Sequence, residues 1–132
     1  MAVGLGEAAD LVVASNHNLQ ELRDLLVETL RELIGRDSIK VNFEASPRLP
    51  NTASLSFKGM SEDPARLLVD VEASRGAACH SGGGAASSIL IKSGLSLEDA
   101  SSTLRLSVGR YTTREEILHA AKSISDAYHK LL

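Results

Sequence analysis

The chain has 132 residues, of which 43% are hydrophobic and 23% are charged, and its formal net charge at pH 7 is -3. This length fits one domain, and the composition is that of a globular protein rather than a disordered or fibrous one. The acidic balance argues against nucleic-acid binding. So does the scarcity of aromatic residues, with two Phe, two Tyr and no Trp, which leaves little for a base-stacking surface.

The chain contains one cysteine, Cys79, so no internal disulfide can form. No charged leader followed by an apolar segment opens the sequence, and no apolar run approaches the length of a membrane span. We therefore expect a cytoplasmic protein that contacts no membrane.

Two helices are predicted at the start of the chain. Residues 1–15 are rich in alanine and predict a short helix. From Asn18 to Gly35 the apolar residues recur at helical spacing, and Asn18 and Glu21 occupy the two positions of a capping box. The predicted buried stripe of this second helix consists of Leu19, Leu22, Leu25, Leu26, Leu30, Leu33 and Ile34.

The next segment predicts two strands joined by a loop that contains two prolines. Ile39, Val41 and Phe43 alternate on one side of the first strand, and Leu55 and Phe57 follow in the second. Short helices are expected after these strands.

The first of these short helices is predicted from Asp63 and Pro64, which fit an N-cap and a first helical residue, and it extends over residues 65–72. Residues 85–94 predict another helical turn or two, and Ser96 is the expected cap of a third short helix.

A third strand, residues 103–109, has two unlike faces. One face carries Leu104, Leu106 and Val108, whereas Arg105 shares the other face with polar residues. This strand leads into the last predicted element.

The chain closes with a helix for which Thr113 and Glu116 form a second predicted capping box. Helices at both ends of the chain and a few strands between them predict an α+β fold, with a short antiparallel sheet and helices on one face. The stripe of the closing helix consists of Ile117, Ala120, Ala121, Ile124, Tyr128 and Leu131.

Cys79 lies in the glycine-rich stretch ASRGAACHSGGGAASS, residues 73–88, and His80 follows it directly. A free cysteine is more often a small buried hydrophobic residue than a nucleophile. A segment with this many glycines is a poor place for a core residue, which favours an exposed and reactive thiol. The pattern leaves both readings open.

Arg105 and Arg110 form a second candidate feature. Desolvating an arginine inside an otherwise apolar strand is unfavourable unless a carboxylate or phosphate binds it, whereas an edge strand would leave Arg105 in solvent. Both alternatives stay open. The histidines lack the spacing of metal ligands, and no metal site is expected.

The segments LPNTASLSFKG, ASRGAACHSG and STLRLSVGRYTTREEI resemble, in this order, the C-terminal part of the NifS-like cysteine desulfurases and selenocysteine lyases. These are class-V aminotransferase-like enzymes that depend on pyridoxal phosphate. The opening MAVGLGEAADLV is similar to the helix that leads from the large to the small domain in this family. The resemblance implies such a leading helix at residues 1–15 and a small C-terminal domain at residues 16–132.

The resemblance also implies roles for individual residues. Cys79 falls on the catalytic cysteine, whose thiolate attacks the sulfur or selenium of a cofactor-bound substrate, keeps it as a persulfide and releases alanine. Arg105 falls on the arginine that binds the α-carboxylate of the substrate. His80 and Arg110 are candidates for supporting this site. The glycines next to Cys79 would let the thiol move between the substrate and an acceptor.

The cofactor site of the family has no counterpart in this sequence. In the family a lysine next to a histidine holds pyridoxal phosphate within the large domain. Here only Lys130 follows a histidine, and it lies two residues from the end of the chain. We expect the large domain and every cofactor-binding residue to be absent from this chain, and the isolated chain to be inactive.

The resemblance implies three partners: cysteine or selenocysteine as substrate, a protein that accepts the sulfur or selenium, and a second copy of the full-length enzyme in a homodimer. The alternative from another class is a non-catalytic binding module that carries a persulfide or binds the acceptor protein. The preference for sulfur or selenium stays open.

Overall fold

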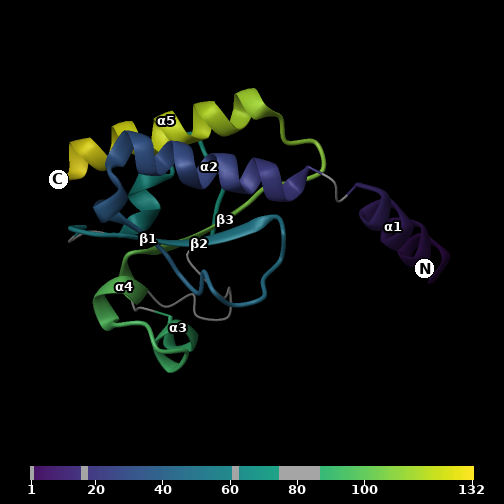
Figure 1. Cartoon of the computed structure of the whole chain (residues 1–132), viewed down its shortest axis with the longest axis horizontal. Helices are drawn as coiled ribbons and strands as arrows, with labels where there is room; N and C mark the ends of the chain where they lie inside the picture. Colours follow the sequence, from purple (N-terminus) through teal and green to yellow (C-terminus); the bar gives the residue numbers. More distant parts are fainter. Residues whose placement is uncertain (1, 16–17, 61–62, 75–86) are drawn as a thin grey trace.

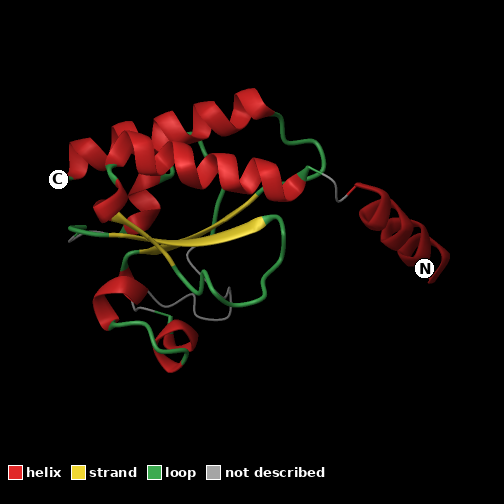
Figure 2. Ribbon diagram, viewed as in Figure 1, coloured by secondary structure: helices red, strands yellow, loops and turns green. Residues whose placement is uncertain are grey.

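The computed structural model describes residues 2–15, 18–60, 63–74 and 87–132. An antiparallel sheet in the order β1-β2-β3 lies between a layer of two long helices and a group of short ones (Figure 1, Figure 2). This architecture confirms the predicted α+β fold and its antiparallel sheet. The elements are α1 (Ala2–Ser15), α2 (Leu19–Ile34), η1 (Arg36–Ser38), β1 (Ile39–Val41), β2 (Thr52–Phe57), η2 (Pro64–Leu67), α3 (Ser88–Lys92), α4 (Leu97–Ser101), β3 (Thr103–Ser107) and α5 (Arg114–Leu131).

The two long helices, α2 and α5, lie side by side on one face of the sheet (Figure 1). Their apolar stripes pack against the apolar side chains of the strands, as the helical spacing predicts. The fully buried side chains at this contact include Leu30, Leu55, Phe57, Leu104 and Ile124. The main hydrophobic cluster therefore lies on this side of the sheet.

The N-terminal helix α1 is confirmed, and it extends away from the sheet (Figure 1). Its apolar residues Val3, Leu5 and Val13 are exposed. Within the described ranges, no helix combines the length and the apolar character that crossing a bilayer requires.

Two expectations for α2 are wrong. The side chain of Asn18 accepts no hydrogen bond from the helix, because its backbone is helical (φ -116°, ψ -8°) rather than extended, so Asn18 and Glu21 form no capping box. Leu33 is 45% exposed and lies outside the buried stripe. The buried face centres on Leu30 and Ile34, which leaves Leu33 at its solvent edge.

The first strand is shorter than predicted. Strand β1 ends at Val41, and Phe43 has a φ of 56°, in the left-handed region that side chains rarely adopt. Phe43 begins a turn instead, in which the N–H of Ser46 donates to its carbonyl oxygen at 3.0 Å. The predicted alternation through Phe43 is therefore wrong, and its ring is exposed.

The structure confirms the predicted start of a helix after Asp63, but the observed element is shorter than predicted. The Asp63 carboxylate accepts a hydrogen bond from the N–H of Ala65 at 2.8 Å, and Pro64 follows the cap. The element is a single 3₁₀ turn that ends at the fully buried Leu67, rather than a helix over residues 65–72.

The predicted caps of α4 and α5 are confirmed, whereas α3 covers only Ser88–Lys92 of the helical turns expected over residues 85–94. The Ser96 hydroxyl accepts a hydrogen bond from the N–H of Asp99 at 3.0 Å, which starts α4. Thr113 and Glu116 form the predicted capping box at the start of α5. The turn after α3 contains Gly94 with a φ of 99°, a conformation suited to glycine.

Candidate functional site

The face of the sheet opposite α2 and α5 is polar. Strand β2 places Ser54 and Ser56 on this face, and β3 places Thr103 and Arg105 on it, since successive side chains of a strand point to opposite faces. The prediction that Arg105 shares its side of the strand with polar residues is confirmed.

Cross-strand pairing arranges this polar face in rows. The N–H of Asn42 donates to the carbonyl oxygen of Ser54 at 2.8 Å. Ser54 pairs with Arg105 in the register of β2 and β3, and Arg105 pairs with Ser74 on its other side. Opposite residues of an antiparallel pair project to the same face. We call Asn42, Ser54, Arg105 and Ser74 the Arg105 row.

The main chain of Arg105 faces Ser74. Its N–H donates to the Ser74 carbonyl oxygen at 2.7 Å, and the N–H of Ser74 donates to the Arg105 carbonyl oxygen at 3.2 Å. The N–H and the C=O of Arg105 therefore both point to Ser74, on the side of β3 away from β2. Because neither group bonds to Ser54 in β2, Arg105 and Ser54 form a non-hydrogen-bonded pair. In such pairs opposite side chains come closest, with Cβ atoms roughly 4.5–5.5 Å apart.

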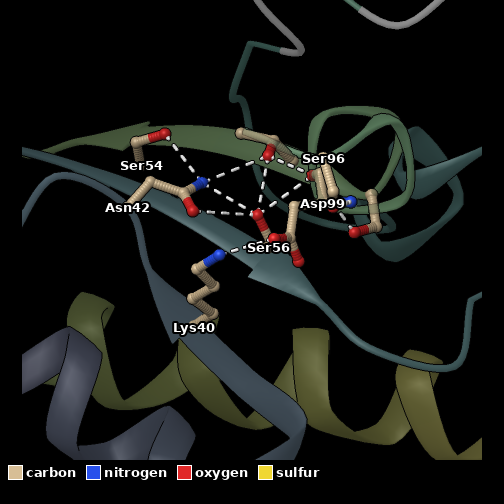
Figure 3. Close-up of polar contacts among 8 residues, drawn as sticks. Lys40, Asn42, Ser54, Ser56, Ser96 and Asp99 are labelled. Atoms are coloured by element: carbon tan, nitrogen blue, oxygen red, sulfur yellow. Dashed lines mark hydrogen bonds and ion pairs between the residues drawn. The ribbon is translucent and has the colours of Figure 1, made fainter. Parts of the chain in front are cut away.

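A hydrogen-bond network centred on Asn42 links the Arg105 row to the neighbouring residues of the polar face (Figure 3). The two hydrogens of the Asn42 amide nitrogen Nδ2 are shared among the hydroxyl oxygens of Ser56 (2.8 Å), Thr103 (3.2 Å) and Ser54 (3.3 Å). The Ser56 and Thr103 hydroxyls in turn lie 3.0 and 2.6 Å from the carbonyl oxygen of Asp99, which accepts from them. The network therefore joins the sheet to α4, which covers this part of the polar face.

Lys40 and Asp99 form an ion pair at the edge of the same network (Figure 3). The hydrogen bond from the Lys40 ammonium holds the pKa of the Asp99 carboxyl below its ordinary value of 3.8, although burial acts in the opposite direction. The hydrogen bond with Ser96 and the charge of Lys58 also lower this pKa. Because Lys40 is neutralised by Asp99, it is not a free cation on the polar face.

Arg105 is exposed on the polar face. Within the part of the chain that the structure describes, no carboxylate or other side chain binds its guanidinium. Of the two readings left open by the sequence, the described residues show a solvent-facing arginine. Its planar guanidinium can bind both oxygens of an incoming carboxylate.

None of the other predicted site residues, Cys79, His80 and Arg110, is seen next to Arg105 on the described part of the polar face. Cys79 and His80 lie outside the described residues, but Ser74 is the last described residue before them, so the segment that leads to Cys79 starts at the Arg105 row. Arg110 lies in the turn between β3 and α5, where its Cζ atom is 5.3 Å from the centre of the Tyr111 ring. Arg110 is therefore not part of the Arg105 row.

Asn42 and Ser54 were not predicted as part of the site. Ser54 and its neighbours Thr52 and Ser56 alternate with Ala53 and Leu55, so the polar half of the period-two pattern was present in the sequence. Asn42 carries no such signal, because it lies just after the end of β1.

Comparison with known proteins identifies the family. The sequence pattern that describes aminotransferase class-V matches residues 1–119. The chain belongs to the class-V aminotransferase family.

Two curated class-V relatives confirm the resemblance to cysteine desulfurases and selenocysteine lyases. The chain is 37% identical to a selenocysteine lyase of Homo sapiens over 99% of its own length, and 34% identical to the cysteine desulfurase IscS of Shewanella sp. (strain ANA-3) over 98%. It spans 32% of each of these relatives. The structure of a NifS-like protein from Rickettsia africae matches with a TM-score of 0.63 and 18% identity, covering 92% of this chain and 30% of that one, which shows the same fold.

Membership of the class-V aminotransferase family implies pyridoxal phosphate, whose aldehyde is held by a lysine that burial or neighbouring charge keeps reactive. A surface groove of about 540 Å³ beside α5 contains Lys122 and Lys130. The Lys122 side chain is 72% exposed and forms an ion pair with Asp126 at 3.2 Å, so its ammonium is solvated and paired. The described lysines do not fit a pyridoxal phosphate site, since all are exposed: Lys40, Lys58, Lys92, Lys122 and Lys130.

Proposed function

We propose that this chain forms the small-domain part of an enzyme that removes sulfur or selenium from cysteine or selenocysteine and releases alanine. The observation that carries the proposal is the position of Arg105. Its exposed guanidinium lies on the open polar face, and its main chain is hydrogen-bonded to Ser74, from which the chain continues to Cys79. A carboxylate-binding residue and the segment with the nucleophile thus start from one row of the sheet.

Arg105 binds the α-carboxylate of the substrate in this proposal. Its fork of N–H donors matches the two carboxylate oxygens, which a lysine ammonium cannot do. The backbone of Arg105 is held in register with both Ser54 and Ser74, so the side chain projects from a fixed point. A rigid origin of this kind suits a residue that orients a small substrate.

Cys79 acts as the nucleophile. Its thiolate sulfur forms a bond to the sulfur or selenium of the substrate, and the bond from that atom to the substrate Cβ breaks with its electron pair going to carbon. The carbon takes up a proton and leaves as alanine, and Cys79 keeps the transferred atom as a persulfide or its selenium analogue. Two thiols thus give one persulfide and one methyl group, so no external oxidant is needed.

The distance along the chain is compatible with this role. Five residues of extended chain span at most about 18 Å, so a thiol five residues after Ser74 can reach the Arg105 row. The pyridoxal phosphate needed for this bond breaking belongs to a part of the enzyme outside this chain. In the same proposal residues 16–132 are the small domain, and α1 (residues 1–15) leads to the large one.

The test is a graft in which this chain replaces the matching third of the Shewanella cysteine desulfurase. Alanine release from cysteine is measured after absorbance has shown that the cofactor is bound. We expect the graft to be active and Cys79→Ala to abolish its activity. Arg105→Lys should raise the KM for cysteine, because the lysine ammonium cannot bind both carboxylate oxygens as the arginine guanidinium does. Arg36→Lys is the control, since Arg36 is an exposed arginine paired with Glu28, away from the polar face.

Full activity of Cys79→Ala in a cofactor-loaded graft would refute the role of this thiol. The origin of the cofactor is tested on the isolated chain by incubation with pyridoxal phosphate, borohydride reduction and peptide mapping. A single saturable adduct on one lysine would contradict a cofactor site outside this chain. Sparse labelling of several lysines is the expected result.

A further inference from the structure

We propose that Ser54 is a second ligand-binding residue beside Arg105 and that its hydroxyl donates a hydrogen bond to the carboxylate that Arg105 binds. This inference rests on the proposed function and adds to it a residue of β2 that neither the sequence patterns nor the family resemblance singles out. It is argued from the position of Ser54 in the sheet, the direction of its hydroxyl group and the charge of the surrounding face.

Ser54 and Arg105 are directly opposite each other on the polar face. Both main-chain groups of Arg105 bond to Ser74, so the pair with Ser54 is of the non-hydrogen-bonded type, in which side chains are closest. Ser54 is half-buried and Arg105 is exposed. A small anion bound by the guanidinium near the sheet surface therefore lies within reach of the Ser54 hydroxyl.

The Ser54 hydroxyl is oriented as a donor. Its oxygen accepts a hydrogen bond from Nδ2 of Asn42 at 3.3 Å. The Ser56 and Thr103 hydroxyls donate their hydrogens to the carbonyl oxygen of Asp99, so they can only accept from Asn42. The amide therefore presents its nitrogen, and not Oδ1, to these hydroxyls and to Ser54 (Figure 3). A hydroxyl carries one hydrogen and two lone pairs. Across the described residues, no acceptor binds the hydrogen of Ser54, which leaves it available to a ligand.

The charge of this face fits a monoanion. Arg105 is the one cation among the four residues of the Arg105 row, and the nearby Lys40 is paired with Asp99. A carboxylate offers about four lone-pair positions, so a guanidinium fork that occupies two of them leaves others for a neutral hydroxyl. One arginine and one serine of this row thus match the α-carboxylate of a small amino acid.

The experiment uses the whole chain and L-alanine, the amino-acid product of the proposed reaction, as the probe. Binding is followed by NMR through the amide shifts of Ser54, Arg105 and their neighbours. The variants are Arg105→Ala, Ser54→Ala, and the pair Ser54→Thr and Ser54→Val, which have the same shape and differ in the hydroxyl. Ser101→Ala is the control, because the Ser101 hydroxyl bonds within α4 to the carbonyl of Leu97.

We expect saturable shifts along the Arg105 row that disappear in Arg105→Ala. Loss of one hydrogen bond to a charged acceptor should weaken binding about tenfold in Ser54→Ala and in Ser54→Val. Ser54→Thr and Ser101→Ala should bind as the parent chain does. The comparison of Thr with Val keeps the test valid if Ser54→Ala does not fold.

Two other outcomes are decisive. If binding is lost in Arg105→Ala but is equal in Ser54→Thr and Ser54→Val, Ser54 is not a ligand-binding residue, while the carboxylate role of Arg105 stands. If the parent chain shows no saturable shift, or if Arg105→Ala binds as well as the parent, the proposed carboxylate site itself is wrong and the role of Ser54 falls with it.

Discussion

Lys40 on β1 and Asp99 on α4 form an ion pair that joins the helix to the edge of the polar face. The same Asp99 accepts hydrogen bonds from Ser56 and Thr103 through its main-chain carbonyl. Helix α4 is therefore held over one row of the polar face by charge and by hydroxyl groups together. In the Arg105 row beside it, Arg105 is exposed and Ser54 and Ser74 are half-buried.

The Asp99 pair makes stability depend on pH. Because the folded protein lowers the pKa of Asp99 below 3.8, this carboxylate stabilises the folded state above the unfolded pKa, and that contribution is lost as pH falls through the folded pKa. Asp99→Asn should lower the free energy of unfolding near pH 7, and its difference from the parent should shrink below about pH 4. Urea unfolding at a series of pH values measures this.

Asp126→Asn is the matched control for that experiment. Asp126 pairs with Lys122 on the exposed surface of α5, where such a pair contributes little. If Asp99→Asn shows the same small and pH-independent effect as Asp126→Asn, the ion pair with Lys40 does not stabilise the contact between α4 and the sheet.

The Asn42 amide should be important for stability. Asn42→Ala removes a buried group that contacts three hydroxyls and leaves those of Ser56 and Thr103 with fewer partners. We expect the free energy of unfolding to fall by about 1–3 kcal/mol, measured by urea titration. A loss below about 0.5 kcal/mol, the size typical of a surface substitution, would mean that the network is replaceable by water.

The two N-caps of the long helices should respond differently to alanine. Thr113→Ala removes a side chain that accepts the N–H of Glu116 at 3.2 Å, and it should cost about 1 kcal/mol. Asn18→Ala should change stability by less than about 0.5 kcal/mol, because the Asn18 side chain accepts no such bond. Equal losses in thermal or urea unfolding would show that Asn18 caps α2 after all.

Leu30 and Leu33 lie three residues apart on α2 and should also differ. Leu30 is fully buried, and Leu30→Ala should cost about 2–5 kcal/mol through lost packing and the cavity that it leaves. Leu33 is 45% exposed, and Leu33→Ala should stay within about 0.5 kcal/mol. A large loss at Leu33 would mean that this face of α2 is covered in solution, for example by a second copy of the chain.

Much of the fold could be predicted from local pattern. The helical stripes of α2 and α5 and the caps at Asp63, Ser96 and Thr113 depend on residues within a few positions of one another. Such spacing is visible in a sequence because helix geometry is local. The errors fall where a single backbone conformation decides, as at Asn18 and Phe43, where the expected capping bond and strand do not form.

The candidate site was also predictable only in its local features. Its residue types were readable from the sequence, since an arginine between apolar residues of a strand and a cysteine among glycines both stand out from their surroundings. The alternation along β3 also indicated which face Arg105 occupies, because a strand has a fixed period of two.

The Arg105 row could not be read from the sequence. Asn42, Ser54, Arg105 and Ser74 come from four separate segments, and only strand pairing brings them side by side. Pairing partners and their register depend on how the apolar faces of distant segments pack together, which no local pattern encodes. Amino-acid order thus sets which polar and charged side chains the strands carry, and long-range packing sets which of them lie side by side.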